Sequence, residues 1–224
     1  MGTKYIAHRG FALLNTENTI EAFTHAAGSA VFGIETDIQV TKDKHFVCFH
    51  DDNTLRLCGV EKLVTESTFQ ELQELRILGK HKIPTLVEYI QVCKSGGKVA
   101  VVELKNRYSD DDIVALVQQI KNQDYLMNTI FISFEMRNVL SLRKLLPNQD
   151  IQFITTTYDR KLLETLSKER IDLNVRFTRL TRSRIAHCQS LGINVNCWTL
   201  NNEKIANHFK DAGIDFITSD ILGA

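Results

Sequence analysis

Residues 203–219 read EKIANHFKDAGIDFITS and contain the unit that decides the fold. Residues 203–212 have the apolar spacing of a helix, Gly213 and Ile214 follow, and residues 216–219 form a short run typical of a strand. The same Gly-Ile pair stands between a helical stretch and a strand at Gly33 and at Gly192. Glycine readily adopts the left-handed conformation that closes a helix. The recurrence predicts repeated helix-to-strand units.

The rest of the chain continues this alternation. Nine apolar or β-branched runs are expected to be strands: 5–8, 33–40, 45–50, 98–105, 129–134, 151–156, 172–177, 193–198 and 216–219. Helical stretches between them include 19–30, 111–122, 137–146 and 203–212, and Thr85 with Glu88 has the form of a capping box. Strands that alternate with helices pair in parallel, so we predict an α/β fold, a closed (β/α)8 TIM barrel. The rival is an open doubly wound sheet, but no glycine-rich phosphate loop follows the first strand.

A hairpin at the second strand explains why nine strands are expected rather than eight. Only four residues separate the runs 33–40 and 45–50, which is too short for a helical crossover. We expect Asp43 and Lys44 at the turn and Lys42 opposite His45, which would place His50 opposite Asp37. The barrel would then be somewhat irregular. We expect a single domain, 1–224, with residues 53–83 as a small cap insertion within it.

Composition excludes several classes of protein. The 224 residues carry 27 basic and 27 acidic side chains, a balance that argues against nucleic-acid binding. No apolar run approaches the roughly 20 residues that span a bilayer, and no signal peptide is visible, so no stable membrane insertion is expected. The five cysteines form no CxxC pair, and we expect them to be reduced and mostly buried in a cytoplasmic protein. The sequence does not indicate an oligomeric state.

Carboxylates interrupt two of the apolar strands. Glu35 and Asp37 lie two residues apart, and Glu103 precedes Lys105 in the same way. Either pair alone is equally well explained by a salt bridge at a strand end. In a barrel, however, the carboxyl ends of the strands converge on the face that carries active sites. Three carboxylates in one place favour a single divalent cation, Mg²⁺ or Ca²⁺, and Arg9 with Lys105 suits an anionic ligand such as phosphate.

Two histidines also stand at strand ends. His8 and His50 each close an apolar run, and a pair of histidines beside a metal site can supply base and acid on opposite sides of a scissile P–O bond. Trp198, the only tryptophan, is either a core residue or an apolar wall for a small substrate at the barrel rim. Glu17, Asn18 and Thr19, the stretch ENT, are either polar residues that start the first helix or, since they follow the loop that begins at His8, residues that support the site.

Nine short stretches, in order, resemble the landmarks of one family, the glycerophosphodiester phosphodiesterases. They are AHRG, ENT, IETDIQVTKD, FHDDNTLR, IPTLVEYI, VELK, ISF, CWTLNN and GIDFITSD, and they cover nearly the whole chain. Two positions depart from the family pattern: Lys44 stands where glycine usually follows Asp43, and Thr16 precedes ENT where proline is common. Both changes affect turns rather than chemical groups.

The resemblance implies a metal-dependent hydrolase on a (β/α)8 barrel that releases sn-glycerol 3-phosphate and an alcohol from glycerophosphodiesters, in glycerophospholipid catabolism. It implies His8 and His50 as the acid/base pair, with one ion of magnesium or calcium on the carboxylates. Residues implied by the family pattern to hold the metal are Glu35, Asp37 and Glu103, and those implied to contact substrate are Arg9, Lys105 and Trp198, the last on the glycerol side. Which histidine acts first as base, and whether water or a substrate hydroxyl attacks, stays open.

Three other functions are compatible with a barrel of this kind. A lipid-directed phospholipase on the same barrel would need an exposed apolar or cationic rim, and we expect none. A non-catalytic module that binds phosphodiesters would not need His8, His50 and the carboxylates together. An aldolase or isomerase would use a lysine, but Lys105 beside Glu103 suits charge pairing better than imine formation.

Overall fold

A computed structural model describes residues 2–224 of the chain, and its strands form a closed parallel barrel with one extra strand. Around the sheet the strand order is β1-β9-β8-β7-β6-β5-β4-β2-β3, and β1 also pairs with β2, which closes the cylinder. The predicted (β/α)8 barrel is confirmed, as are all nine strands. Their bounds are β1 Lys4–Ala7, β2 Gly33–Val40, β3 Phe46–Cys48, β4 Val99–Leu104, β5 Thr129–Ser133, β6 Ile151–Thr155, β7 Asp172–Arg176, β8 Val195–Trp198 and β9 Phe216–Ser219.

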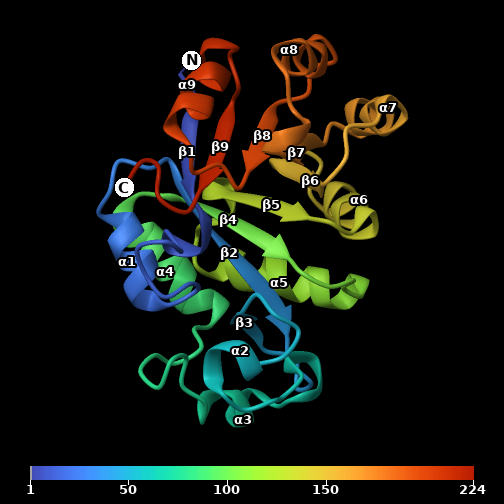
Figure 1. Ribbon diagram of the computed structural model, residues 1–224. Coiled ribbons are helices and arrows are strands. Elements are labelled where there is room, and N and C mark those ends of the chain that lie inside the picture. Colours follow the sequence, from blue (N-terminus) through green and yellow to red (C-terminus); the bar gives the residue numbers. More distant parts are fainter. Residues whose placement is uncertain (1) are drawn as a thin grey trace.

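Helices cover the outside of the barrel, as Figure 1 shows for α5 to α9 around the strands. Their bounds are α1 Ile20–Ala27, α2 Leu55–Cys58, α3 Phe69–Gln73, α4 Leu86–Gly96, α5 Asp110–Asn122, α6 Met136–Leu145, α7 Arg160–Glu169, α8 Arg182–Ser190 and α9 Glu203–Asp211. Short 3₁₀ turns are η1 His8–Gly10, η2 Val64–Glu66, η3 Leu126–Asn128 and η4 Phe177–Arg179. The predicted capping box at Thr85 and Glu88 opens α4, and a second one, at Thr68 and Glu71, opens α3.

Side-chain alternation along the strands separates two apolar layers. On β4, Val102 packs outward into the large core beneath the helices, whereas Val101 belongs to a smaller cluster inside the barrel with Ile6 and Ile132. Successive side chains of a strand point to opposite faces, so Glu103 shares the inner face with Val101. The same alternation sends Glu35 inward. The polar residues that interrupt the strands therefore point into the barrel.

The β2–β3 hairpin exists, but its predicted register is wrong by one residue. Ile38 pairs with Cys48 and Val40 with Phe46, so His50 does not lie opposite Asp37. The connection has three residues rather than two, because Thr41 N–H donates to the His45 carbonyl and Lys44 takes a left-handed φ of 67°. This is the common three-residue hairpin in which the last loop residue is left-handed.

Residues 53–83 form a small lobe beyond β3, at the bottom of Figure 1. The lobe has its own apolar cluster, in which Leu57, Leu72 and Ile77 pack against Phe49 from the end of the hairpin. An antiparallel bridge between Asn53 and Leu63 closes its first loop. The lobe is thus anchored to the strand end that leads to His50.

The described residues contain no helix that is both long and apolar enough to cross a membrane. The five cysteines are free, and all but Cys58 are buried.

Candidate active site

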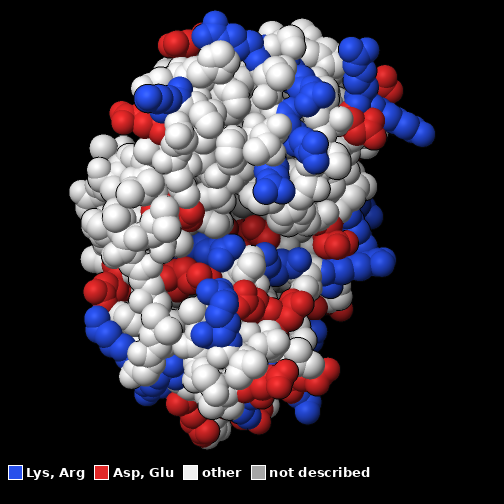
Figure 2. Space-filling view, in the orientation of Figure 1, with Lys and Arg blue, Asp and Glu red and all other residues white. Residues whose placement is uncertain are grey.

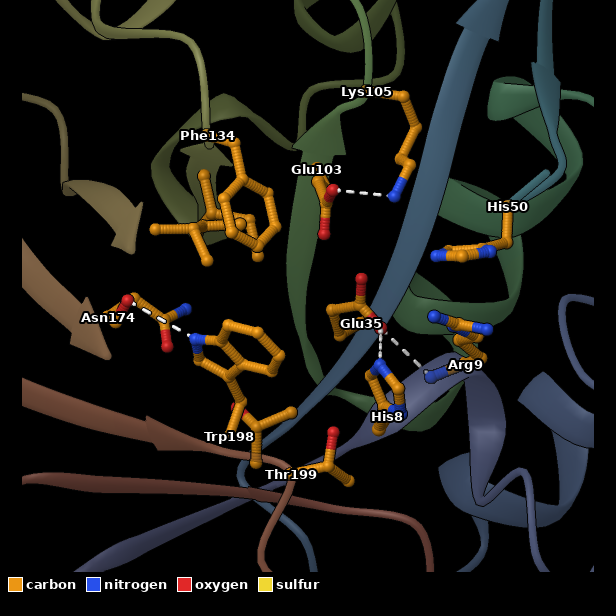
Figure 3. Close-up of a pocket in the computed structure, with 13 residues that line it drawn as sticks. His8, Arg9, Glu35, His50, Glu103, Lys105, Phe134, Asn174, Trp198 and Thr199 are labelled. Atoms are coloured by element: carbon orange, nitrogen blue, oxygen red, sulfur yellow. Dashed lines mark hydrogen bonds and ion pairs between the residues drawn. The ribbon is translucent and has the colours of Figure 1, made fainter. Parts of the chain in front are cut away.

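A pocket of about 250 Å³ opens at the carboxyl ends of the barrel strands (Figure 3). Of the eight residues predicted to form the site, seven line the pocket and Asp37 lies fully buried beneath it. The residues brought together at the lining are His8, Arg9, Glu35, His50, Glu103, Lys105 and Trp198. In Figure 3 the charged and titratable groups occupy one half of the pocket, and Phe134, Trp198 and Asn174 occupy the other.

Glu35, Asp37 and Glu103 form a buried acidic triad. Asp37 of β2 is the register partner of Glu103 of β4, and an oxygen from each of the three carboxylates lies within 4.8 Å of the others. Burial, reinforced by the charge of Asp37, raises the pKa of Glu35 to about 8 and also raises the pKa of Glu103. Without a bound cation, simultaneous ionisation of all three carboxyl groups is therefore strongly unfavourable.

Two cations partly compensate the acidic triad. Arg9 Nε lies 3.1 Å from Asp37 Oδ2, and Lys105 Nζ lies 3.3 Å from Asp37 Oδ1 and 3.0 Å from Glu103 Oε1. Burial alone would raise the pKa of Asp37, but the charges of Arg9 and Lys105 outweigh it and hold this pKa well below its usual range. Asp37 is therefore the member of the triad whose ionised form is most favoured.

The loop that carries His8 and Arg9 has an unusual backbone. Arg9, Gly10 and Phe11 all have positive φ, at 50°, 78° and 65°. A Cβ at Gly10 would lie only 2.6 Å from the carbonyl carbon of Ala22, so the tight approach of this loop to α1 requires glycine. The turn aims the Arg9 amide at Glu35, to which its N–H donates over 3.0 Å. Strained backbone of this kind is typical of functional sites.

His8 and His50 are each oriented by an aspartate. His8 Nδ1 lies 2.6 Å from Asp220 Oδ1, and its Nε2 faces Glu35 at 4.0 Å. Burial lowers the pKa of His8, but the bond to Asp220 and the charge of Glu35 outweigh it and raise this pKa overall. His50 Nδ1 lies 2.7 Å from Asp51 Oδ1, and burial, together with the nearby cations, lowers the pKa of His50. The Nε2 atom of each ring is left without a hydrogen-bond partner among the described residues.

An apolar wall faces the charged groups. Trp198 packs edge-to-face on Phe134, with ring centroids 5.5 Å apart, and its indole N–H donates to the Asn174 carbonyl over 3.3 Å. Ile132 and Ile154 from inside the barrel complete this wall. Such a surface suits the carbon atoms of a small substrate held with its charged end near the acidic triad.

The acidic triad fits a hard divalent cation. All candidate donors are carboxylate oxygens, which Mg²⁺ and Ca²⁺ prefer. Glu35 Oε1 is buried and has no hydrogen-bond partner among residues 2–224, although a buried carboxylate oxygen is normally satisfied. An ion bound at this point would supply the missing partner.

The sequence leaves a supporting role open for Glu17 and Asn18, in the stretch ENT, and assigns none to Asp51 and Asp220. Asn18, with φ 53°, donates through Nδ2 to Asp37 over 2.8 Å, and Glu17 pairs with Arg9. Asp51 and Asp220 hold the two histidines. Glu17, Asn18, Asp51 and Asp220 fall inside the stretches ENT, FHDDNTLR and GIDFITSD, so the family resemblance contained the signal, whereas local spacing did not. Phe134 falls inside the stretch ISF in the same way, whereas Asn174 lies in none of the nine stretches.

The fold and this pocket define a (β/α)8-barrel enzyme with a buried acidic site beside cations that suit phosphate. A model of the glycerophosphoryl diester phosphodiesterase family matches residues 8–224. The chain belongs to that family, and the predicted enzyme class is confirmed.

The relatives agree with this assignment. The chain is 32% identical over 228 residues to YhdW of Bacillus subtilis, covering 96% of this chain and 93% of YhdW. It is 28% identical over 235 residues to a glycerophosphodiester phosphodiesterase of Caldanaerobacter subterraneus, covering 98% and 95% of the two chains. A solved phosphodiesterase of Oleispira antarctica, in complex with the product sn-glycerol-3-phosphate, matches with a TM-score of 0.90 at 25% identity and covers 98% of this chain and 93% of its own.

Proposed function

We propose that the protein hydrolyses glycerophosphodiesters to sn-glycerol 3-phosphate and an alcohol. The observation that carries the proposal is the meeting, in one pocket, of His8 and His50 with the acidic triad and two cations. The Oleispira antarctica phosphodiesterase, with its bound sn-glycerol-3-phosphate, supports the same product for this chain.

The charge balance of the pocket supports a divalent cation and a phosphodiester. Three ionised carboxylates opposed by Arg9 and Lys105 leave one negative charge, and a divalent ion on Glu35, Asp37 and Glu103 would reverse it to one positive charge. A phosphodiester carries one negative charge, which matches that site. When bound, Mg²⁺ or Ca²⁺ supplies Lewis-acid polarisation of a phosphoryl oxygen. Arg9 and Lys105 hold the remaining phosphoryl oxygens and stabilise the charge that develops on them.

The histidines move the protons. One of His8 and His50 takes a proton from the nucleophile, water or a substrate hydroxyl, through its free Nε2, and the other protonates the departing alkoxide. Asp220 and Asp51 fix which ring nitrogen faces the substrate, because each aspartate accepts a hydrogen bond from Nδ1. Trp198 lines the glycerol side, where its ring and Phe134 exclude water.

The setting of this reaction belongs to the same proposal. The alcohols released are those of glycerophospholipid headgroups, so the enzyme acts in glycerophospholipid catabolism. The five free cysteines support a cytoplasmic location, since thiols stay reduced there. Residues 53–83 serve as a cap at the pocket edge, which is supported by the contact of Arg56 with Glu17.

The test is release of glycerol 3-phosphate from glycerophosphocholine and glycerophosphoethanolamine, with Mg²⁺, with Ca²⁺ and with chelator. We expect metal-dependent release that disappears in His50→Ala, while circular dichroism and metal affinity stay close to those of the wild type. Asp37→Ala should lose metal affinity and turnover together. Release from lysophospholipids alone would favour the lipid-directed phospholipase, and phosphodiester binding without any release would favour the non-catalytic module.

A further inference from the structure

The segment from the end of β7 to the first turn of α8 concentrates positive charge. Arg176 ends β7, and Arg179, Arg182 and Arg184 follow within eight residues. Residues 173–202 contain no Asp or Glu, although the whole chain has equal numbers of acidic and basic residues. The expectation that the chain has no cationic rim is therefore wrong, because the balance of the whole chain conceals a local excess.

The geometry of β7 places this charge at the pocket mouth. Arg176 follows Asn174 by two positions, so the two side chains leave the same face of the strand, and Asn174 lines the pocket. Arg176 is also the register partner of Trp198 on β8, and its side chain is exposed. Figure 2 shows basic side chains in a row that descends from α8, over β7 and β8, to the charged hollow at the centre of this face.

The guanidinium groups of Arg179 and Arg184 are held in place without being neutralised. Arg179 Nε donates to the Thr156 carbonyl over 3.1 Å. Arg184 donates to the Arg179 carbonyl and lies 4.6 Å from the centroid of the Tyr158 ring. Within residues 2–224, no carboxylate oxygen lies within 4.0 Å of a side-chain nitrogen of Arg176, Arg179 or Arg184. We call these three residues the arginine rim.

Arg182 is the exception among the four. Its Nη2 lies 4.0 Å from Asp211 Oδ2 on α9, so its charge is shared with that helix. Neighbouring rim segments do not neutralise the arginine rim. Residues 199–202 after β8 are TLNN and uncharged, and after β6 the carboxylate of Asp159 is engaged by the backbone of Lys161.

A second observation points to a polar ligand on the same strand. Asn174 is 2% exposed, and its Oδ1 has no hydrogen-bond partner among the described residues. A buried amide oxygen without a partner is unfavourable unless a ligand or water satisfies it. The inner face of β7 therefore offers an unused acceptor within the pocket and an unpaired arginine at its mouth. A hydroxyl followed by an anionic group is the chemistry that satisfies both.

We propose that the arginine rim is a second anion subsite, which binds a further phosphate group of the substrate beyond the phosphate that is cleaved. The inference rests on the proposed function and names its substrate class: glycerophosphodiesters that carry two or more phosphates. Substrates with a cationic alcohol such as choline gain nothing from the rim. Guanidinium groups suit this role, because their planar donors match phosphate oxygens.

A lipid surface is a weaker fit to the same charges. Membrane association through a basic segment is strengthened by large apolar side chains that enter the headgroup region. In the loop 177–181 Leu180 is buried and Phe177 is half-buried, so no large apolar side chain of this loop is exposed beside the arginines.

The test compares two soluble diesters, 1,3-bis(glycerophospho)glycerol, with two phosphates, and glycerophosphoglycerol, with one. The first probe can place its second phosphate at the rim whichever end is cleaved. In the wild type at low salt we expect the ratio of kcat/KM for 1,3-bis(glycerophospho)glycerol to kcat/KM for glycerophosphoglycerol to be at least about ten. A tenfold ratio is about the effect of one charge-assisted hydrogen bond. Added NaCl should reduce this ratio. In Arg176→Gln/Arg179→Gln the ratio should fall to near one, whereas Arg137→Gln on the outer helix α6 should leave it unchanged.

Calorimetric titration of the same proteins with 1,3-bis(glycerophospho)glycerol, in the presence of chelator, separates this inference from the proposed function. Weaker binding in the double variant, but not in Arg137→Gln, would support the rim even if no diester were turned over. An unchanged ratio and an unchanged affinity in the double variant would overturn it. Rim-dependent binding to phosphatidylglycerol vesicles, without any preference between the two diesters, would also overturn it and assign the rim to a lipid surface.

Discussion

His8 and Asp220 are 212 positions apart in the chain, yet the imidazole Nδ1 lies 2.6 Å from the carboxylate oxygen Oδ1. The contact exists because β1 and β9 are neighbours in the closed barrel, with Ala7 the register partner of Ser219. Asn201 Nδ2 donates to the other oxygen of Asp220 over 2.8 Å, so the carboxylate is held on both sides. Asp220 is therefore placed to fix both the tautomer and the orientation of His8.

Asp220→Asn should lower kcat while leaving KM and the fold nearly unchanged. The amide cannot reproduce a carboxylate that accepts from both His8 and Asn201, so the ring loses its fixed tautomer. We expect kcat to fall by roughly 10²- to 10⁴-fold, the range of a general acid–base contribution. Steady-state kinetics and circular dichroism check this. A variant with wild-type kcat would show that Asp220 has no part in positioning His8.

Arg56 links the lobe of residues 53–83 to contacts of two residues of the proposed catalytic site, Arg9 and His50. Its guanidinium donates to Glu17, which pairs with Arg9, and to Asp51, which orients His50. Arg56→Gln should lower kcat/KM by about tenfold through the loss of charge-assisted bonds. The side chain is 48% exposed, so stability should change by less than about 1 kcal/mol.

The matched control for Arg56 is Arg76→Gln in the same lobe. Arg76 is exposed, and among the described residues its side chain donates only to backbone carbonyls. If Arg56→Gln and Arg76→Gln lowered kcat/KM equally, the effect would arise from a general disturbance of the lobe. The contacts of Arg56 with Glu17 and Asp51 would then have no specific role.

Lys44→Gly should stabilise the protein. Lys44 has φ 67°, and a left-handed conformation costs a residue with a Cβ about 1–2 kcal/mol, more than the roughly 0.5–1 kcal/mol of extra chain entropy that glycine loses on folding. The substitution also removes the ion pair between Lys44 and Asp112. This pair contributes little to stability, because the lysine side chain is 67% exposed. We expect a gain of up to about 1 kcal/mol in the free energy of unfolding.

Urea titration of Lys44→Gly and Lys44→Ala separates these effects. The alanine variant removes the same ion pair but keeps the strain, so it should show no gain. If glycine stabilises no more than alanine, the hairpin turn does not store the strain assigned to it.

Asp172 should make stability depend on pH at the amino end of the barrel. Burial raises its pKa to about 6, although both carboxylate oxygens accept hydrogen bonds from Asn194. In the unfolded chain the group titrates near about 4. Between these values the folded protein keeps a proton that the unfolded chain has lost, so the contribution of Asp172 to the free energy of unfolding falls as pH rises from about 4 to about 6.

Asp172→Asn removes this dependence. Urea titration at pH 4.5 and at pH 7 measures the free energy of unfolding of both proteins. Relative to the wild type, the variant should be more stable at pH 7 than it is at pH 4.5. A difference that is the same at both pH values would mean that the pKa of Asp172 is not raised.

The hairpin shows where sequence reasoning reached its limit. The four-residue gap correctly predicts a turn between β2 and β3. The predicted strand register differs from the observed one by one residue, because the loop has three residues, with Lys44 left-handed, rather than two. His50 nevertheless reaches the pocket, since β3 ends at Cys48 and the chain leaves the sheet before His50. A register derived from strand alternation no longer applies there.

The sequence by itself determined the barrel and the inward direction of Glu35, Asp37 and Glu103. Alternation of helix and strand patterns and the period of two along a strand are local properties, which can be read from neighbouring residues. Only the tertiary structure decided which side chains meet: Asp220 with His8, Arg56 with Glu17, and the arginine rim with the pocket mouth. Those contacts depend on closure of β1 against β9 and on the path of the loops, and no local pattern in the chain encodes distances between residues so far apart.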